Sequence, residues 1–200
     1  MKKNLLALAF LVGLLTCCKS EDAPIKPVKP TDPGSINKEY MSRAETTFAN
    51  IFKYYWSDKV RMMFGSYPNT LGTPQEPSSP DYDSHAYLWG LGSVVSAFNA
   101  IVQNTDNVDF RMTYESRLKE TLLKYYNTTK EPMCFGCFVN PHDQRLYDDA
   151  IWVGIDLADL YSKTKDSWYL DYAKSVWNFV LSGKDDELGG GVYWDENAKD

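Results

Sequence analysis

Helical segments of two kinds alternate along this chain, and that alternation restricts the fold more than any other feature. Apolar residues recur at helical spacing in five segments, which we expect to be helices. The second and fourth segments are apolar around most of their circumference and rich in small residues, whereas the others keep one polar face. The five segments are 37–56, 84–103, 109–126, 147–163 and 166–181.

The chain also repeats itself with a period of about 60 residues, because Trp89-Gly-Leu-Gly-Ser resembles the later Trp152-Val-Gly-Ile-Asp. One helical hairpin per repeat, with alternating buried and half-buried helices, predicts an all-α toroid of two concentric layers. In such a toroid the inner helices run in one direction, so the loops that lead into them share one end. Long loops at one end of a rigid scaffold are typical binding sites. These loops are 75–84, 131–146 and 185–194.

The N-terminal residues have the composition of a bacterial export signal. Two lysines precede an apolar run at 5–15, which is too short to span a bilayer as a helix. The run ends in a pattern that resembles the lipid-modified cysteine of bacterial lipoproteins. Cys18 fits this pattern best and Cys17 is the alternative, while ordinary secretion with two free thiols is a second interpretation. We expect a signal peptide at 1–17 and a lipid anchor in the bacterial cell envelope, at the outer membrane.

The segment 18–35 carries four prolines among polar residues, so we expect an extended tether from membrane to domain. The remaining residues, 36–200, are enough for one hydrophobic core. Formal net charge is −6 and no basic patch is present, which argues against a nucleic-acid partner. We expect a monomer without a cofactor.

Asp148 and Asp149 stand side by side at the start of the fourth predicted helix. The ordinary role of an aspartate at this place is capping, since its oxygen accepts an unpaired backbone N–H. The helix that follows is apolar nearly all round, which places its start deep in the fold. Two carboxyl groups at short range cannot both ionise freely, so one should keep its proton to a higher pH. An acid beside a carboxylate is what hydrolysis of a glycosidic bond needs.

Three motifs of the chain resemble those of glycoside hydrolase family 76, the α-1,6-mannanases. They are Tyr147-Asp-Asp-Ala-Ile-Trp152, the glycine-rich run from Gly189 to Trp194, and Tyr87-Leu-Trp89. The resemblance covers about residues 37–200. It implies an (α/α)6 barrel, of which this chain carries about the first half. It also implies retaining endo-hydrolysis of α-1,6-mannosidic linkages, with α-mannan or its oligosaccharides as the partner.

The resemblance further implies that Asp148 is the nucleophile and Asp149 the acid/base. Retaining enzymes hold these carboxyl groups about 5 to 5.5 Å apart, a spacing that neighbouring side chains at a helix start can reach. The other expected sugar contacts are Trp89, Trp152, Tyr193, Trp194, His85 and Asp83. Core packing is the alternative for Trp89 and Trp152, and hydrogen bonding or helix capping is the alternative for His85 and Asp83.

Three further polar groups have ordinary interpretations. Cys134 and Cys137 form a C-x2-C with His142 nearby, but zinc wants four ligands and no second pair exists, so we predict no metal. A local disulfide and two separate thiols both remain open. Asp156, two turns below the aspartate pair, either lines the lumen or binds a neighbouring helix.

Two other functions compete with mannan hydrolysis. One is a non-catalytic glycan-binding surface lipoprotein, which would not need an acidic pair at the head of a buried helix. The other is a different toroid glycosidase, such as an unsaturated glucuronyl hydrolase. That enzyme needs cationic groups for a uronate carboxylate, and Arg145 keeps this interpretation open.

Overall fold

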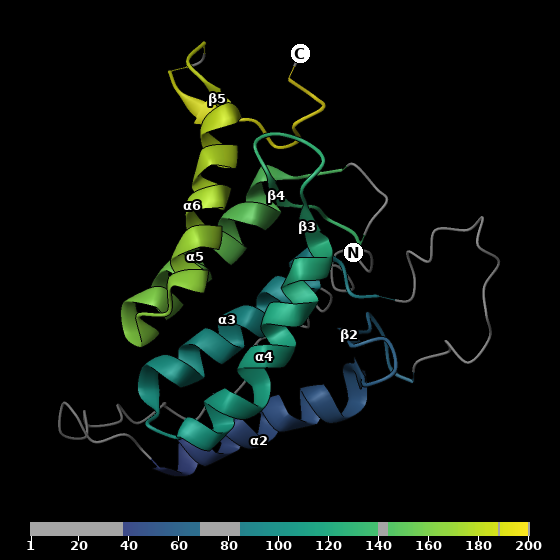
Figure 1. The fold of residues 1–200 in the computed structure, drawn as a ribbon, viewed down its shortest axis with the longest axis vertical. Helices are drawn as coiled ribbons and strands as arrows, with labels where there is room; N and C mark the ends of the chain where they lie inside the picture. The colour runs from purple at the N-terminus through teal and green to yellow at the C-terminus, as the bar shows by residue number, and fades with distance from the viewer. Residues whose placement is uncertain (1–37, 69–84, 140–143, 188, 200) are drawn as a thin grey trace, which may run out of the picture. The chain divides into compact units, whose positions relative to one another are not determined.

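Five helices make up most of the computed structural model, which describes residues 38–68, 85–139, 144–187 and 189–199 (Figure 1). These residues belong to one compact unit, 36–200. The mostly helical architecture confirms the all-α prediction. The helices are α2 (Lys38–Tyr55), α3 (Leu88–Asn104), α4 (Val108–Tyr125), α5 (Tyr147–Thr164) and α6 (Ser167–Ser182).

The predicted helix boundaries are close to those observed, except at the start of α3. The periodicity predicts a helix from residue 84, but α3 begins at Leu88. His85 is instead paired with Phe64 in an isolated β-bridge, and Tyr87 is extended, with φ −62° and ψ 157°. Backbone pairing with Met63 and Phe64 therefore holds Ala86 and His85 outside the helix. No described helix is long and apolar enough to cross a membrane.

Three short antiparallel hairpins follow α2, α4 and α6, and the sequence analysis did not predict them. They pair β1 (Trp56–Ser57) with β2 (Met62–Met63), β3 (Tyr126–Asn127) with β4 (Cys134–Phe135), and β5 (Lys184–Asp185) with β6 (Gly191–Val192). Strands of two residues are too short to show the alternation that identifies a strand in sequence.

The same hydrogen bond closes each hairpin onto the end of its helix. The backbone N–H just after the second strand donates to the carbonyl at the end of the preceding helix. The pairs are Phe64 to Tyr55 (2.8 Å), Gly136 to Tyr125 (2.7 Å) and Tyr193 to Gly183 (2.9 Å). The repeating unit is therefore an outer helix, a hairpin and an inner helix, and the glycine-rich run belongs to the third hairpin.

Contacts between neighbouring repeats confirm the period of about 60 residues. Side-chain hydrogen bonds join Thr105 to Glu45 and Ser96 to Asp156, both separated by 60 positions. Farther along the same helices, Gln103 donates to the carbonyl of Asp159 at 2.9 Å. Because later residues of α3 meet later residues of α5, the two inner helices run in the same direction, as predicted.

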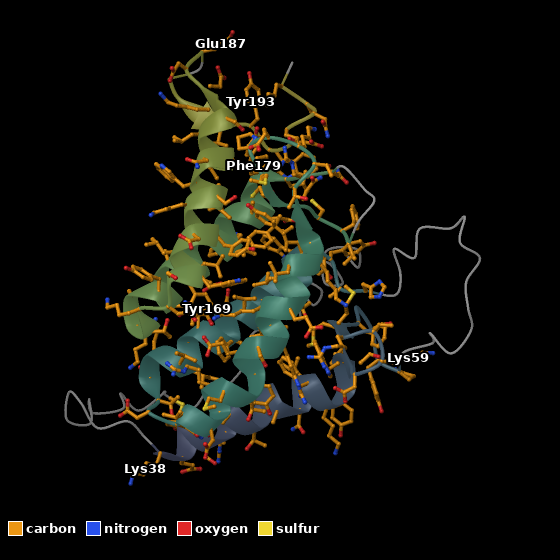
Figure 2. All side chains as sticks on the ribbon, viewed as in Figure 1. Lys38, Lys59, Tyr169, Phe179, Glu187 and Tyr193 are labelled. Atoms are coloured by element: carbon orange, nitrogen blue, oxygen red, sulfur yellow. The ribbon has the colours of Figure 1, made fainter. Side chains whose placement is uncertain are left out.

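The core lies between these two layers. An aromatic cluster joins α2, α3 and α4, with Phe48 in ring contact with Phe98 at 6.0 Å and with Phe110 at 5.4 Å. Helices α5 and α6 lie side by side in Figure 1. Phe179 of α6, which is labelled in Figure 2, stacks on Tyr147 of α5 with ring centroids 4.4 Å apart. This stacking fixes the end of α5 that carries the aspartate pair.

The expectation that α5 is buried nearly all round is wrong for one of its faces. Trp152 is 53% exposed and Ile155 49% exposed, whereas Val153 and Leu157 on the other faces are fully buried. The reason is that α3 and α6 cover two sides of the helix, and in the described residues the remaining side has no helix packed on it. This uncovered side is where the cavity described below opens.

Replacing Gly154 with alanine should destabilise the protein, because α5 and α6 approach closely at this residue. A Cβ at this position would lie 2.6 Å from Cγ1 and 3.1 Å from Cβ of the buried Val176. Overpacking of this kind costs about 1–3 kcal/mol. The free energy of unfolding, from denaturant titration of the complete protein, measures the effect.

Gly90 provides a control, since it is also a glycine of an inner helix, in the first turn of α3. The nearest atom to a Cβ at Gly90 is Cβ of Ala86, at 3.9 Å. Alanine should therefore leave the free energy of unfolding unchanged or raise it by up to about 1 kcal/mol through helix propensity. Equal changes for the two variants would contradict the close approach at Gly154.

Candidate active site

The aspartate pair lies in the first turn of α5 but does not cap it. Leu146 occupies the N-cap position and makes no side-chain capping hydrogen bond, and Tyr147 precedes the pair as the first helical residue. Asp148 and Asp149 are therefore inside the helix, near the positive end of its dipole. The ordinary explanation for a helix-initial aspartate, a capping hydrogen bond, does not apply here.

Asp149 faces a cavity between the two inner helices. The cavity has a volume of about 300 Å³ and is lined by Trp89, Gly92, Ser93, Ser96, Asp149 and Trp152. Asp149 is only 8% exposed. Burial, and next the negative charge of Asp148, raise the pKa of Asp149, while a hydrogen bond with Cys137 acts in the opposite direction. This carboxyl group therefore keeps its proton to a higher pH than an ordinary aspartate does.

Asp148 is half-buried and has an unusual oxygen. Its Oδ1 atom is shielded from solvent and has no hydrogen-bond partner among the described residues. A buried carboxylate oxygen without a partner is costly to maintain. A buried polar atom without a hydrogen-bond partner is rare in native structures and calls for a specific explanation. A catalytic role of the residue is one such explanation. Unlike Asp149, Asp148 is not one of the residues that line the cavity.

Trp89 and Trp152 stand on opposite helices at the cavity wall, and neither belongs to the core. They are 55% and 53% exposed, respectively. Trp89 also borders a second, apolar cavity of about 410 Å³, which Tyr55 and Phe64 help to line. Exposed indole faces beside a carboxyl group can stack on the apolar face of a sugar ring, so core packing, the alternative interpretation of these tryptophans, does not hold here.

Two of the three predicted loops meet at the starts of the inner helices. The loop before α5 reaches α3, where the N–H of Leu88 donates to the carbonyl of Cys137 at 2.9 Å. The third hairpin reaches α5, where the N–H of Tyr147 donates to the carbonyl of Trp194 at 2.9 Å. The first loop, 75–84, lies outside the described residues. The described loops therefore share one end of the scaffold, and the aspartate pair lies at that end.

Of the other predicted sugar contacts, Tyr193, Trp194 and His85 are not among the residues that line the cavity. Tyr193, which is labelled in Figure 2, is half-buried against the core and directly follows β6. Trp194 is 62% exposed, and the His85 ring stacks on Phe64 with centroids 6.0 Å apart. Asp83, together with the cysteines at 17 and 18, lies outside the described residues. A role in sugar binding stays a prediction for Tyr193, Trp194, His85 and Asp83, and lipidation stays a prediction for Cys18 or Cys17.

Arg145 has a structural partner and does not face the cavity. It is fully buried, and its Nε and Nη2 atoms donate to the two carboxylate oxygens of Glu196 at 2.8 and 2.6 Å. Its Nη1 atom donates to the carbonyls of Lys130 and Pro132. A guanidinium group engaged in this way cannot hold the carboxylate of a uronate. Arg145 was the residue that supported a glucuronyl hydrolase, and it has a structural role instead.

Both cysteines of the C-x2-C are free, buried thiols. The described residues contain no group of three or more His, Cys, Asp or Glu that could hold a metal ion, and His142 lies outside them. Burial, and next the charge of Asp149, raise the pKa of Cys137 to about 12, so this thiol is protonated at neutral pH.

Asp156 binds a neighbouring helix, which was one of its two interpretations. Its carboxylate accepts hydrogen bonds from the Ser96 hydroxyl and, at 2.9 Å, from the Asn99 amide. Burial raises the pKa of Asp156, and these two hydrogen bonds oppose the rise. The network ties α3 to α5 below the cavity.

Sequence analysis missed three small residues that line the cavity: Gly92, Ser93 and Ser96. The sequence pattern does predict them, because they follow Trp89 at intervals of three, four and seven residues. Residues at these intervals share one face of a helix. A tryptophan expected to bind sugar would therefore have marked this face of α3 as part of the site.

Comparison with known proteins gives a consistent match. The model of glycosyl hydrolase family 76 matches residues 39–200. A family 76 glycoside hydrolase from a bovine Bacteroides thetaiotaomicron strain is 27% identical, with a TM-score of 0.65 over 78% of this chain and 33% of that chain. A family 76 mannosidase from Bacteroides thetaiotaomicron VPI-5482 is 24% identical, with a TM-score of 0.64 over 79% of this chain and 42% of that chain.

A family 76 α-mannanase from Bacteroides thetaiotaomicron is 20% identical, with a TM-score of 0.58 over 82% of this chain and 42% of that chain. These matches confirm the predicted fold: the helices form part of an (α/α)6 barrel. The chain spans between about a third and two fifths of the length of these solved structures. No curated protein matches the chain.

Proposed function

The chain belongs to glycosyl hydrolase family 76, and we propose that the protein hydrolyses α-1,6-mannosidic linkages of mannan with retention of configuration. The observation that carries the proposal is the buried Asp149, whose pKa is raised by burial and by Asp148, on the wall of a cavity flanked by two exposed tryptophans. This arrangement supplies a proton donor beside a second carboxylate, together with flat apolar surfaces for sugar rings.

The proposed reaction uses each carboxyl group in a separate role. In the first step, the Asp148 carboxylate attacks the anomeric carbon while Asp149 gives its proton to the leaving glycosidic oxygen, which leaves a mannosyl ester on Asp148. In the second step, Asp149, now ionised, removes a proton from a water molecule that attacks the same carbon. The ester bond breaks, Asp148 is released as a carboxylate, and Asp149 is protonated again.

The lining of the cavity supports a neutral substrate. Its described residues include no lysine or arginine, and its polar groups other than Asp149 are the hydroxyls of Ser93 and Ser96 and the indole N–H groups of Trp89 and Trp152. Hydroxyl groups and indole faces suit the alternating polar and apolar surfaces of a neutral hexose. A uronate would need a cation, and Arg145 is engaged by Glu196.

The proposal is tested by incubating the complete protein with linear α-1,6-linked mannan and separating the products. Appearance of short mannooligosaccharides supports it, and the configuration of the newly formed reducing ends, read by NMR early in the reaction, tests retention. Binding of mannan without any turnover would favour a glycan-binding protein instead. Polyuronate of similar length serves as the negative control.

We also propose that the protein is anchored in the bacterial cell envelope, at the outer membrane, through a lipid on Cys18, with Cys17 as the alternative position. Two lysines and a short apolar run before these cysteines support this. Replacing both cysteines with serine should move the protein from the membrane fraction to the soluble fraction of cells. A protein that stays soluble when its cysteines are intact would contradict the anchor.

A further inference from the structure

Ser96 is the residue at which a buried polar network meets the cavity between α3 and α5. It lines the cavity together with Asp149 and Trp152, and its hydroxyl donates a hydrogen bond to the carboxylate of Asp156. Asp156 is 6% exposed and is not among the residues that line the cavity. Asp149, Trp152 and Asp156 follow one another along α5 at intervals of three and four positions, so they share one face of that helix. Ser96 therefore stands between the cavity and a buried carboxylate.

The direction of each hydrogen bond in this network is fixed, because a backbone carbonyl and an ionised carboxylate can only accept. The carbonyl of Asp159 accepts from the side-chain amide of Gln103 at 2.9 Å, and the same Gln103 nitrogen donates to the side-chain oxygen of Asn99 at 3.1 Å. The Asn99 amide nitrogen is thereby directed to Asp156, where it donates to Oδ1 at 2.9 Å. Oδ2 of Asp156 faces Ser96, so the proton in that hydrogen bond comes from the serine.

A serine hydroxyl has one proton and two acceptor positions. Because Asp156 engages the proton, Ser96 offers the cavity an acceptor and no donor. We propose that Ser96 is a substrate-binding residue that accepts a hydrogen bond from a hydroxyl group of the mannose ring, and that Asp156 is the positioning residue that sets this polarity. The identity of the sugar rests on the proposed function, whereas the polarity of the site follows from the network.

An acceptor of fixed polarity selects ligands by what they can donate. A hydroxyl that rotates freely can pair with a donor or with an acceptor, so it distinguishes poorly between them. A site built to pair with a ligand hydroxyl rejects an analogue without that group, because a polar group of the protein is then left unpaired. Fluorine is close to a hydroxyl group in size but has no proton to donate. We therefore expect that neither hydrogen nor fluorine can replace the mannose hydroxyl that Ser96 binds.

Binding of α-1,6-mannobiose analogues to the complete protein at neutral pH tests the proposal. The Asp148→Ala variant keeps the ligands intact during the titration, since Asp148 is the proposed nucleophile and does not line the cavity. Each ring hydroxyl is replaced in turn by hydrogen or by fluorine, and Kd is measured by calorimetry. At one ring position both replacements should weaken binding by about 3- to 10-fold, which corresponds to one neutral hydrogen bond. Fluoro analogues that bind as well as the parent sugar at every position would overturn the proposal.

Two substitutions, each added to the Asp148→Ala protein, test the assigned roles. Ser96→Ala should weaken binding of the parent sugar by about 3- to 10-fold, and the hydroxyl, hydrogen and fluorine ligands at that position should then bind alike. Asp156→Asn is nearly isosteric and places an amide donor opposite Ser96, so the serine proton can turn to the cavity. The fluoro ligand should then gain relative to the deoxy ligand. Discrimination against fluorine that survives either substitution would overturn the role of that residue.

Ser93 supplies the matched control, since it is the other serine that lines the cavity. Its hydroxyl donates to the carbonyl of Trp89, one turn earlier in the same helix, at 3.3 Å, and not to a buried carboxylate. Ser93→Ala should therefore leave the discrimination at the ring position assigned to Ser96 unchanged. An equal loss of discrimination in the two serine variants would show a general change of the cavity and would overturn the specific role of Ser96.

Turnover of linear α-1,6-mannan by the wild-type protein is measured beside the binding series, so that the two proposals can fail separately. Hydrolysis of mannan without any discrimination that depends on Ser96 would overturn the role of Ser96 and leave the proposed function intact. Discrimination that depends on Ser96, in a wild-type protein that does not hydrolyse mannan, would support the role of Ser96 in binding and reject the proposed hydrolysis.

Discussion

Replacing either Asp148 or Asp149 with alanine should nearly abolish hydrolysis of α-1,6-mannan by the complete protein. Loss of a positioned acid/base costs roughly 10²- to 10⁴-fold in rate, which is the expected fall in kcat for Asp149→Ala. We expect at least the same loss for Asp148→Ala, because the covalent intermediate cannot form without the nucleophile. Initial rates of product release measure both effects.

The two aspartates should differ in their dependence on the leaving group. An aryl α-mannoside with an acidic phenol needs little protonation as its bond breaks, so the first step with Asp149→Ala should recover on this substrate. Asp148→Ala should stay inactive on it. Recovery of both variants, or of Asp148→Ala alone, would contradict the assigned roles.

Asp159 is the matched control for the aspartate pair. It is an exposed aspartate on the same helix, and its replacement by alanine should leave the rate within about twofold of wild type, since surface substitutions away from special features have small effects.

The rate of the wild-type protein should fall as pH rises through the raised pKa of Asp149, because the acid is then ionised. A wild-type rate that does not fall as the pH rises would remove Asp149 from the acid role.

Replacing Glu196 with alanine should lower the free energy of unfolding by about 3–5 kcal/mol, because it leaves a fully buried guanidinium group without its partner. The side chains of Arg145 and Glu196 are 0% and 6% exposed, and their two hydrogen bonds are 2.8 and 2.6 Å long. Denaturant titration of the complete protein measures the change. Since Glu196 joins the third hairpin to the start of α5, the variant should also lose activity.

Asp186 provides a control, because its ion pair with Lys184 has side chains 80% and 57% exposed. Asp186→Ala should change the free energy of unfolding by less than about 1 kcal/mol. A Glu196→Ala variant as stable as Asp186→Ala would show that the buried pair does not stabilise the hairpin.

The Glu196 effect should depend on pH in a defined direction. Burial by itself would raise the pKa of Glu196, but hydrogen bonds and charges from Arg145 and Lys130 outweigh it, so the pKa is lowered from 4.5. A lowered pKa means that the stabilisation is present above 4.5 and is lost as pH falls through the folded-state value. The difference between wild type and Glu196→Gln should therefore shrink in acid. A difference that grows in acid would contradict the pair.

The sequence by itself determined the features that depend on near neighbours along the chain. Apolar residues three and four positions apart lie on one face of a helix in any context, so the five helices and their alternation could be predicted. The repeat of about 60 residues could be predicted for the same reason, since each repeat carries its own pattern. The position of Asp148 and Asp149 in the first turn of α5 also follows from local periodicity.

Only the tertiary structure decided which side chains are buried and what they contact. Trp152 and Val153 are adjacent and both apolar, yet one is 53% exposed and the other fully buried, because α3 and α6 cover different sides of α5. Arg145 depends on Glu196, 51 positions away, and the carbonyl of Cys137 meets the N–H of Leu88 only after the loop before α5 folds back onto the start of α3. The cost of burying a charge and the pKa of a carboxyl group depend on groups brought together from distant positions, and these contacts cannot be read from local sequence.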